Sequence, residues 1–169
     1  MKHLSRRGML KTLGAAGMAV PLVSTVGVAQ AASLPTVTGL RAAHRSDVTP
    51  NFDRVVIDMT GPMAAEIQWE YVAKLIADGS GFEVAIEGTN KYQLTLRGAQ
   101  AHNDAGTSTV AQRTITPRLP IVRQIKLFSD FEGLVLVGIG LNRETRTRTL
   151  VLHDSARNSV RAVVDFFIL

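Results

Sequence analysis

The chain has 169 residues, no cysteine, and 19 lysine and arginine residues against 14 acidic residues. The lack of cysteine excludes disulfide bonds, thiolate metal ligands and a cysteine nucleophile, so an apolar core must stabilise any folded domain. Four of the basic residues precede residue 32, and the remaining 15 against 14 acidic residues leave a net charge of about +1. This balance argues against a nucleic-acid partner, because such proteins carry a clear basic excess.

The first 31 residues are organised like an export signal. Arg6 and Arg7 precede an apolar run at residues 13–28, and the segment resembles a twin-arginine signal peptide with a signal helix. The small residues at 29–31 predict cleavage after Ala31. Glycine and proline interrupt the apolar run, which is shorter than the about 20 residues of a spanning helix. Cleavage is therefore favoured over retention as an anchor, and no membrane span is expected afterwards.

Beyond the signal, apolar and polar residues alternate with the period of two that is typical of half-buried β-strands. Residues 32–50 are expected to form an N-terminal strand and linker leading into a domain at residues 51–169. The clearest predicted strands are 53–59, 66–71, 92–97, 121–127, 133–141 and 160–166.

Two of these segments carry more detailed expectations. Residues 64–77 could compete as a helix, but the alternation at 66–71 favours a strand. The segment 133–141 is apolar on both faces, which is typical of a central strand. Its Gly138 and Gly140 are expected to admit an aromatic side chain from a facing sheet, Trp69 or Phe166, or to let the strand bend.

Turn residues separate the predicted strands. Residues 129–133 are expected to form a hairpin loop. About nine short strands at this spacing favour an all-β fold, a sandwich or a barrel.

Histidine is the residue that most often carries chemistry in a chain without cysteine. His44, His102 and His153 show no metal-binding spacing, and Ser129 has no adjacent base. Exposed or structurally hydrogen-bonded histidines are favoured over a site assembled across loops. The oxygen-rich loops at 78–81 and 102–104 suit turns better than calcium. No catalytic residue, metal or cofactor is therefore predicted.

Arginine is the better candidate for binding. Arg146 and Arg148 are two residues apart and would point to one face of a strand, where their guanidinium groups suit carboxylate or phosphate. The alternative is a solvated strand end whose charges guard an edge, with Glu144 and Asp154 neutralising the arginines. Arg54 has the same two interpretations, with Asp58 as its alternative partner.

Three blocks of the sequence carry a family resemblance. Phe52–Val56, Asp130–Gly133 followed by Val137–Leu141, and Val163–Asp165 resemble the AMIN-like domain of exported actinobacterial proteins. The resemblance implies a single-domain antiparallel β-sandwich. The related AMIN domain targets periplasmic amidases and secretins to the cell wall. Many AMIN-like proteins resemble lipoproteins with a cysteine after the signal, which this chain lacks, so no lipid can be attached there.

Together these patterns predict a secreted, extracytoplasmic, non-catalytic binding module of the cell envelope. Its candidate binding residues are Arg54, Arg146, Arg148 and His102, and its expected partner is a cell-wall polymer. The alternatives are an adaptor that presents a sheet edge to another exported protein, or a small cell-wall hydrolase with a site assembled from loops. The ligand and the oligomeric state stay open.

Overall fold

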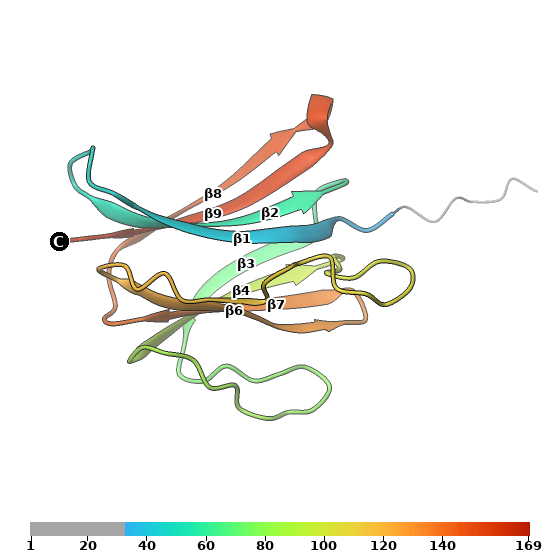
Figure 1. Ribbon diagram of the computed structural model, residues 1–169, viewed down its shortest axis with the longest axis horizontal. Helices are drawn as coiled ribbons and strands as arrows, with labels where there is room; N and C mark the ends of the chain where they lie inside the picture. The colour runs from blue at the N-terminus through green and yellow to red at the C-terminus, as the bar shows by residue number, and fades with distance from the viewer. Residues whose placement is uncertain (1–32) are drawn as a thin grey trace, which may run out of the picture. The chain divides into compact units, whose positions relative to one another are not determined.

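A computed structural model describes residues 33–169, and these form two antiparallel β-sheets packed face to face (Figure 1). The predicted signal and its cleavage site lie outside the described residues. None of the described residues belongs to a helix that is long and apolar enough to cross a membrane. The elements are β1 (Thr36–Arg45), β2 (Phe52–Thr60), β3 (Glu66–Val72), β4 (Asn90–Arg97), β5 (Thr114–Ile115), β6 (Val122–Phe131), β7 (Leu134–Leu141), β8 (Thr147–Asp154), the short 3₁₀ helix η1 (Ser155–Arg157) and β9 (Ser159–Phe167).

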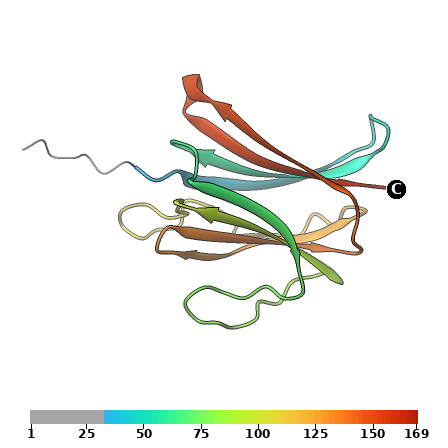
Figure 2. The same cartoon turned by 180° about the vertical axis from the view of Figure 1, so that it is seen from behind.

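Within residues 33–169, nine strands build the sandwich, as the alternation predicts. Sheet A has the order β1-β2-β9-β8, and sheet B has the order β3-β4-β7-β6-β5. The reverse view in Figure 2 shows the same two layers, with β8 and β9 in the upper sheet. The prediction of an all-β antiparallel sandwich is confirmed. Residues 36–45, placed by the sequence in an N-terminal strand and linker, form the edge strand β1 of sheet A.

The core lies between the sheets and follows the period-two pattern. In β2, Val55, Ile57 and Met59 are buried, whereas Arg54 and Asp58 point to the outer face. Tyr92 of β4 occupies the centre of an aromatic cluster with Trp69, Tyr71 and Phe166. Aromatic contacts of this kind add to the stabilisation from burial alone.

The hairpin between β6 and β7 is tighter than the sequence indicates. The predicted hairpin is confirmed, but its loop is shorter than residues 129–133, because β6 continues to Phe131 and β7 begins at Leu134. Only Glu132 and Gly133 form the turn, with φ of 48° and 76°. Two central residues with positive φ match the twist of the flanking strands.

The glycines of β7 serve a different contact from the one predicted. Gly138 and Gly140 pair with Gln93 and Lys91 on the outer side of sheet B, so they do not face Trp69 or Phe166. A Cβ at Gly138 would clash with Leu75, and one at Gly140 would clash with the carbonyl of Glu87. The loop of residues 73–89 therefore packs directly on the strand backbone.

Candidate binding face

The outer side of sheet A presents five arginines from all four of its strands. Strand alternation puts every second side chain on this side, and the antiparallel register aligns them in rows across the sheet. One row runs Ala43, Arg54, Asp165, Arg148 from β1 to β8. We call this surface the arginine face, and its arginines are Arg41, Arg45, Arg54, Arg148 and Arg161.

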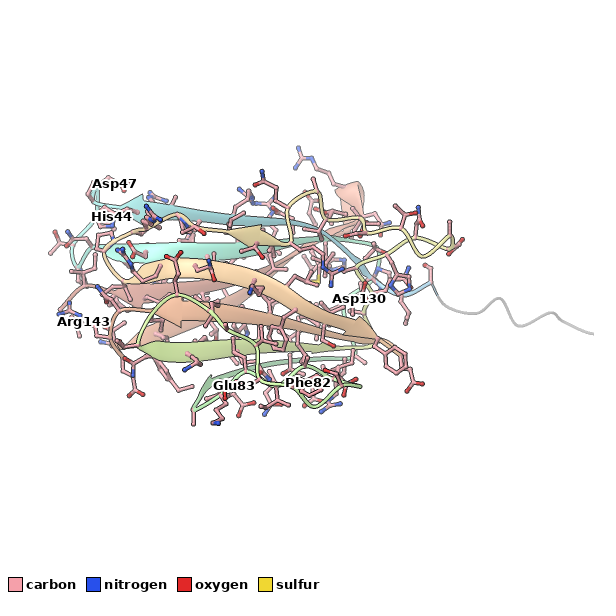
Figure 3. The ribbon with its side chains drawn as sticks, turned by 60° about the horizontal axis from the view of Figure 1, so that its bottom comes forward. His44, Asp47, Phe82, Glu83, Asp130 and Arg143 are labelled. Carbon is pink, nitrogen blue, oxygen red and sulfur yellow. The ribbon has the colours of Figure 1, made fainter. Side chains whose placement is uncertain are left out.

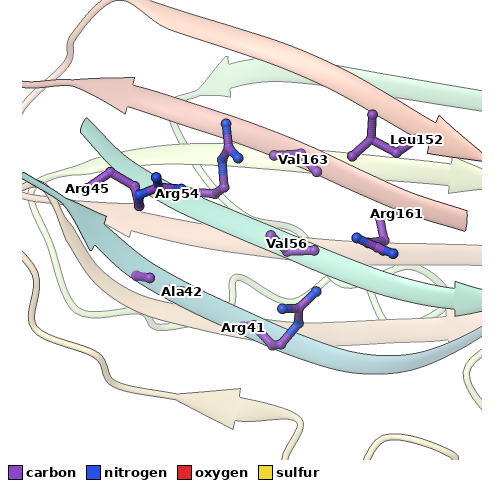
Figure 4. A pocket seen from close by; sticks show the side chains of 9 residues that line it. Arg41, Ala42, Arg45, Arg54, Val56, Leu152, Arg161 and Val163 are labelled. Atoms are coloured by element: carbon purple, nitrogen blue, oxygen red, sulfur yellow. The ribbon is translucent and has the colours of Figure 1, made fainter. Parts of the chain in front are cut away.

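A hollow of about 400 Å³ lies on the arginine face (Figure 4). Val56 and Val163 form its floor, and arginines from β1, β2 and β9 stand around them. A second hollow of about 380 Å³ adjoins it and shares Arg45 and Arg54. The two hollows form one extended depression with an apolar floor and cationic walls.

Asp165 binds two of the arginines on this surface. Its carboxylate is fully buried and accepts two hydrogen bonds from Arg54, at 2.7 and 2.9 Å. Arg148 donates two more to Oδ2, at 3.1 and 2.6 Å. Burial by itself raises the pKa of Asp165, but the hydrogen bonds from Arg54 and Arg148 outweigh it, so the pKa lies below its ordinary value. Asp165 therefore stays ionised and holds both guanidinium groups in place.

The other acidic residues neutralise only part of the face. Arg41 pairs bidentately with Asp58, at 2.5 and 2.8 Å, so the predicted alternative pairing of Asp58 with Arg54 is wrong. Hydrogen bonds from Arg45 lower the pKa of Asp47 to about 2. Arg161 forms no ion pair with any of residues 33–169. Four of the five arginines thus share three carboxylates, whereas Asp154 on the same side pairs with Arg157.

Two phenylalanines lie beneath the arginines at one end of the face. Phe52 and Phe167 are register partners and meet edge to face, with ring centroids 5.7 Å apart. The guanidinium of Arg54 lies 5.1 Å from the Phe52 ring, and that of Arg148 lies 5.6 and 5.7 Å from the two rings. Cation–π contacts restrict these long side chains.

The sequence-predicted residues fall into two groups. Arg54 and Arg148 lie on the arginine face, and Arg146 lies at its rim, 5.7 Å from the ring of Phe167. Neither Glu144 nor Asp154 pairs with Arg146 or Arg148, since Asp154 binds Arg157. His102 lies elsewhere and contacts Asp130.

Three arginines of the arginine face are not among the residues predicted from the sequence: Arg41, Arg45 and Arg161. The spacing of Arg41, Ala43 and Arg45 is itself a period-two signal for one strand face. This spacing does not show that the face lies beside Arg54, because that neighbourhood depends on the register between β1 and β2.

His44 and His102 each have a structural partner, and the two do not converge. His44 Nδ1 lies 2.8 Å from the buried Asp53, which also accepts hydrogen bonds from the backbone of Ile121 and Val122. His102 Nδ1 lies 2.9 Å from Asp130. Figure 3 shows His44 and Asp130 at opposite ends of the sandwich. Within residues 33–169, no group of three or more histidine or acidic side chains is arranged to hold a metal ion.

The comparison with protein families agrees with this architecture. The AMIN-like domain model matches residues 35–167, which include all nine strands. No curated protein and no solved structure matches the chain. Because the family match covers most of the sequence, the chain belongs to the AMIN-like domain family.

Proposed function

We propose that the protein is a non-catalytic binding module of the cell envelope, and that its arginine face holds an anionic cell-wall polymer. The AMIN-like family supports a wall-associated role. The observation that carries the proposal is the extended hollow, in which arginines surround an apolar floor and outnumber their carboxylate partners. Guanidinium groups match carboxylate and phosphate in geometry as well as in charge.

The length of the face suits a polymer better than a small anion. Arg146 and Arg161 make no ion pair with residues 33–169 and lie near opposite ends of β9. Arg146 lies opposite Phe167, and Phe167 is six residues from Arg161 along β9. At the rise of a β-strand, six residues correspond to about 20 Å. Successive anionic groups of one polymer could therefore contact both ends at once.

Retention on purified cell wall tests the proposal. At low salt the wild-type protein should bind the insoluble wall, and retention should fall as salt screens the exposed arginines. Arg161→Gln should weaken binding about fivefold, equivalent to about 1 kcal/mol, because it removes one cation that no carboxylate offsets. Arg123→Gln is the matched control, since Arg123 lies on β6 of the opposite sheet and, like Arg161, forms no ion pair with any of residues 33–169.

Two results would contradict the proposal. One is the absence of retention at low salt, and the other is an equal loss in the Arg161→Gln and Arg123→Gln variants. The same incubation should release no soluble wall fragments, and steady release would instead favour a hydrolase.

The proposed place of work is outside the cytoplasmic membrane, reached through a twin-arginine signal. Replacing Arg6 and Arg7 by lysine should leave the protein in the cytoplasmic fraction. Continued export of that variant would mean that another route is used.

A further inference from the structure

The outer edge of β8 is an unpaired strand edge. Among residues 33–169, β8 pairs only with β9, so its other side has no strand beside it. Most of its side chains are exposed on both faces of the sheet, including the adjacent Val151 and Leu152, which are 40% and 48% exposed. Figure 1 shows the β8–β9 hairpin rising away from sheet B toward η1. An apolar edge of this length is a template for pairing with another strand.

The remaining sheet edges are better protected. β1 has a register irregularity between Val37 and Gly39, and its start is bridged by Gln100. β5 is two residues long, and β3 alternates glutamate and glutamine on its exposed side. Bulges, short strands and charged residues are the common means of blocking edge pairing. β8 is eight residues long and has no bulge, and its charged residues Arg148 and Asp154 flank an uncharged central Leu-Val-Leu segment.

The backbone of β8 fixes which residues can pair outward. The Phe167 amide donates to the Arg146 carbonyl, so these two residues form a hydrogen-bonded pair. Every second residue of β8 after Arg146, beginning with Arg148 opposite Asp165, therefore also bonds to β9. In an antiparallel ladder, alternate residues bond to opposite sides. Thr149, Val151 and His153 therefore direct their backbone groups to the free edge.

We propose that β8 pairs antiparallel with β8 of a second copy of this chain, about a two-fold axis at Val151. This register joins two outward-directed residues, Val151 and its equivalent. On the outer face, this register also sets Leu150 of one copy opposite Leu152 of the other, and Arg148 of one copy opposite Asp154 of the other. Opposite charges and apolar pairs directly across from each other stabilise adjacent strands.

The charge pairing extends contacts already present in each copy. Arg148 binds Asp165, and Asp154 binds Arg157. Setting Arg148 beside Asp154 of the second copy forms a row of alternating charge across the two-fold axis. Registers centred on Leu150 or Leu152 lose this pairing, because Arg148 would then face Leu152 or lie opposite residue 156. The self-complementary charge pattern selects a second copy as the occupant.

Sedimentation velocity of the purified protein tests the dimer. The wild type should sediment at twice the mass of the chain at high concentration. Val151→Lys puts like charges together at the axis and should raise the dimer dissociation constant about tenfold or more. Met63→Lys is the matched control, because it adds the same charge at another exposed apolar position. A monomeric wild type would overturn the proposal and would leave β8 to a different partner, as would a Val151→Lys variant that dimerises like the control.

Cysteine cross-linking tests the register independently. The chain has no cysteine, so Val151→Cys introduces a single thiol. Directly opposed residues in a hydrogen-bonded pair have Cα atoms about 5.5 Å apart, within reach of a disulfide. Val151→Cys should therefore form a covalent dimer under oxidation, whereas Thr149→Cys, opposite His153, should not. Cross-linking by Thr149→Cys and not by Val151→Cys would overturn this register.

Discussion

Asp165 sets the properties of the arginine face at the scale of single residues. One buried carboxylate orients two arginines that would otherwise be long, mobile side chains. It also cancels part of their charge, so it stabilises the fold while it weakens attraction for an anion. These two effects have opposite signs and can be separated by one substitution.

Asp165→Asn should lower stability and increase anion binding. The variant removes charge-assisted hydrogen bonds and leaves Arg54 without its carboxylate, which should cost about 1.5–3 kcal/mol in the free energy of unfolding. Retention on cell wall should rise, because two guanidinium groups lose their internal counterion. A variant that binds more weakly while still folded would show that Asp165 orients the arginines more than it competes with the ligand.

The stability effect should depend on pH. The pKa of Asp165 is lowered in the folded protein, so its contribution is fully present above the unfolded carboxyl pKa of about 3.9. The contribution is lost as the pH falls through the lower folded value. The difference in unfolding free energy between wild type and Asp165→Asn should therefore be constant near neutral pH and shrink below about pH 4. Denaturant titrations across this range measure it, and a difference that grows in acid would contradict the assignment.

At the scale of elements, sequence patterns predict where the strands lie better than they predict which elements contact those strands. The alternation in β2 and β3 locates both strands and their buried faces, because burial of one sheet face imposes a period of two. The same pattern does not show which element covers the outer side of β7. Gly138 and Gly140 are visible as glycines in the sequence, but the covering segment comes from 50 or more residues earlier.

The candidate site, too, can be predicted only in part from the sequence. Arg54 and Arg148 can be found from the sequence, since each lies on the polar side of a predicted strand. Their shared partner Asp165 cannot, because the contact depends on the pairing of β2 and β8 with opposite sides of β9. His102 lies away from the arginine face and contacts Asp130, and for a histidine in a loop the sequence does not separate ligand binding from such a hydrogen bond.

The packing of loop 73–89 on β7 should make Gly140 intolerant of a side chain. In Gly140→Ala the new methyl group meets the Glu87 backbone, which cannot rotate away as a side chain can, and overpacking of this kind costs about 1–3 kcal/mol. Gly39→Ala is the matched control, because the nearest atom to its Cβ is 3.6 Å away on Asp58. Thermal unfolding should separate the two variants. Equal stability would show that the loop moves aside without cost.

At the scale of the whole molecule, the two sheets have different outer surfaces. Sheet B is covered by its own loop, whereas sheet A exposes its arginines and the edge of β8 that no strand within residues 33–169 pairs with. Pairing through β8 would place the arginine faces of two copies on the same side of one continuous sheet, since the two-fold axis is perpendicular to it. A polymer that spans both copies would then be held by more sites without any new contact within either copy.

The arginine face is the proposed binding site of the anionic polymer. The most direct test is an NMR titration of the labelled protein with a soluble anionic cell-wall polymer. Amide shifts should change along β1, β2 and β9, with the largest changes near Arg54, Arg161 and Val163, and should vanish at high salt. Shifts confined to sheet B and loop 73–89, or no shifts at low salt, would contradict the claim.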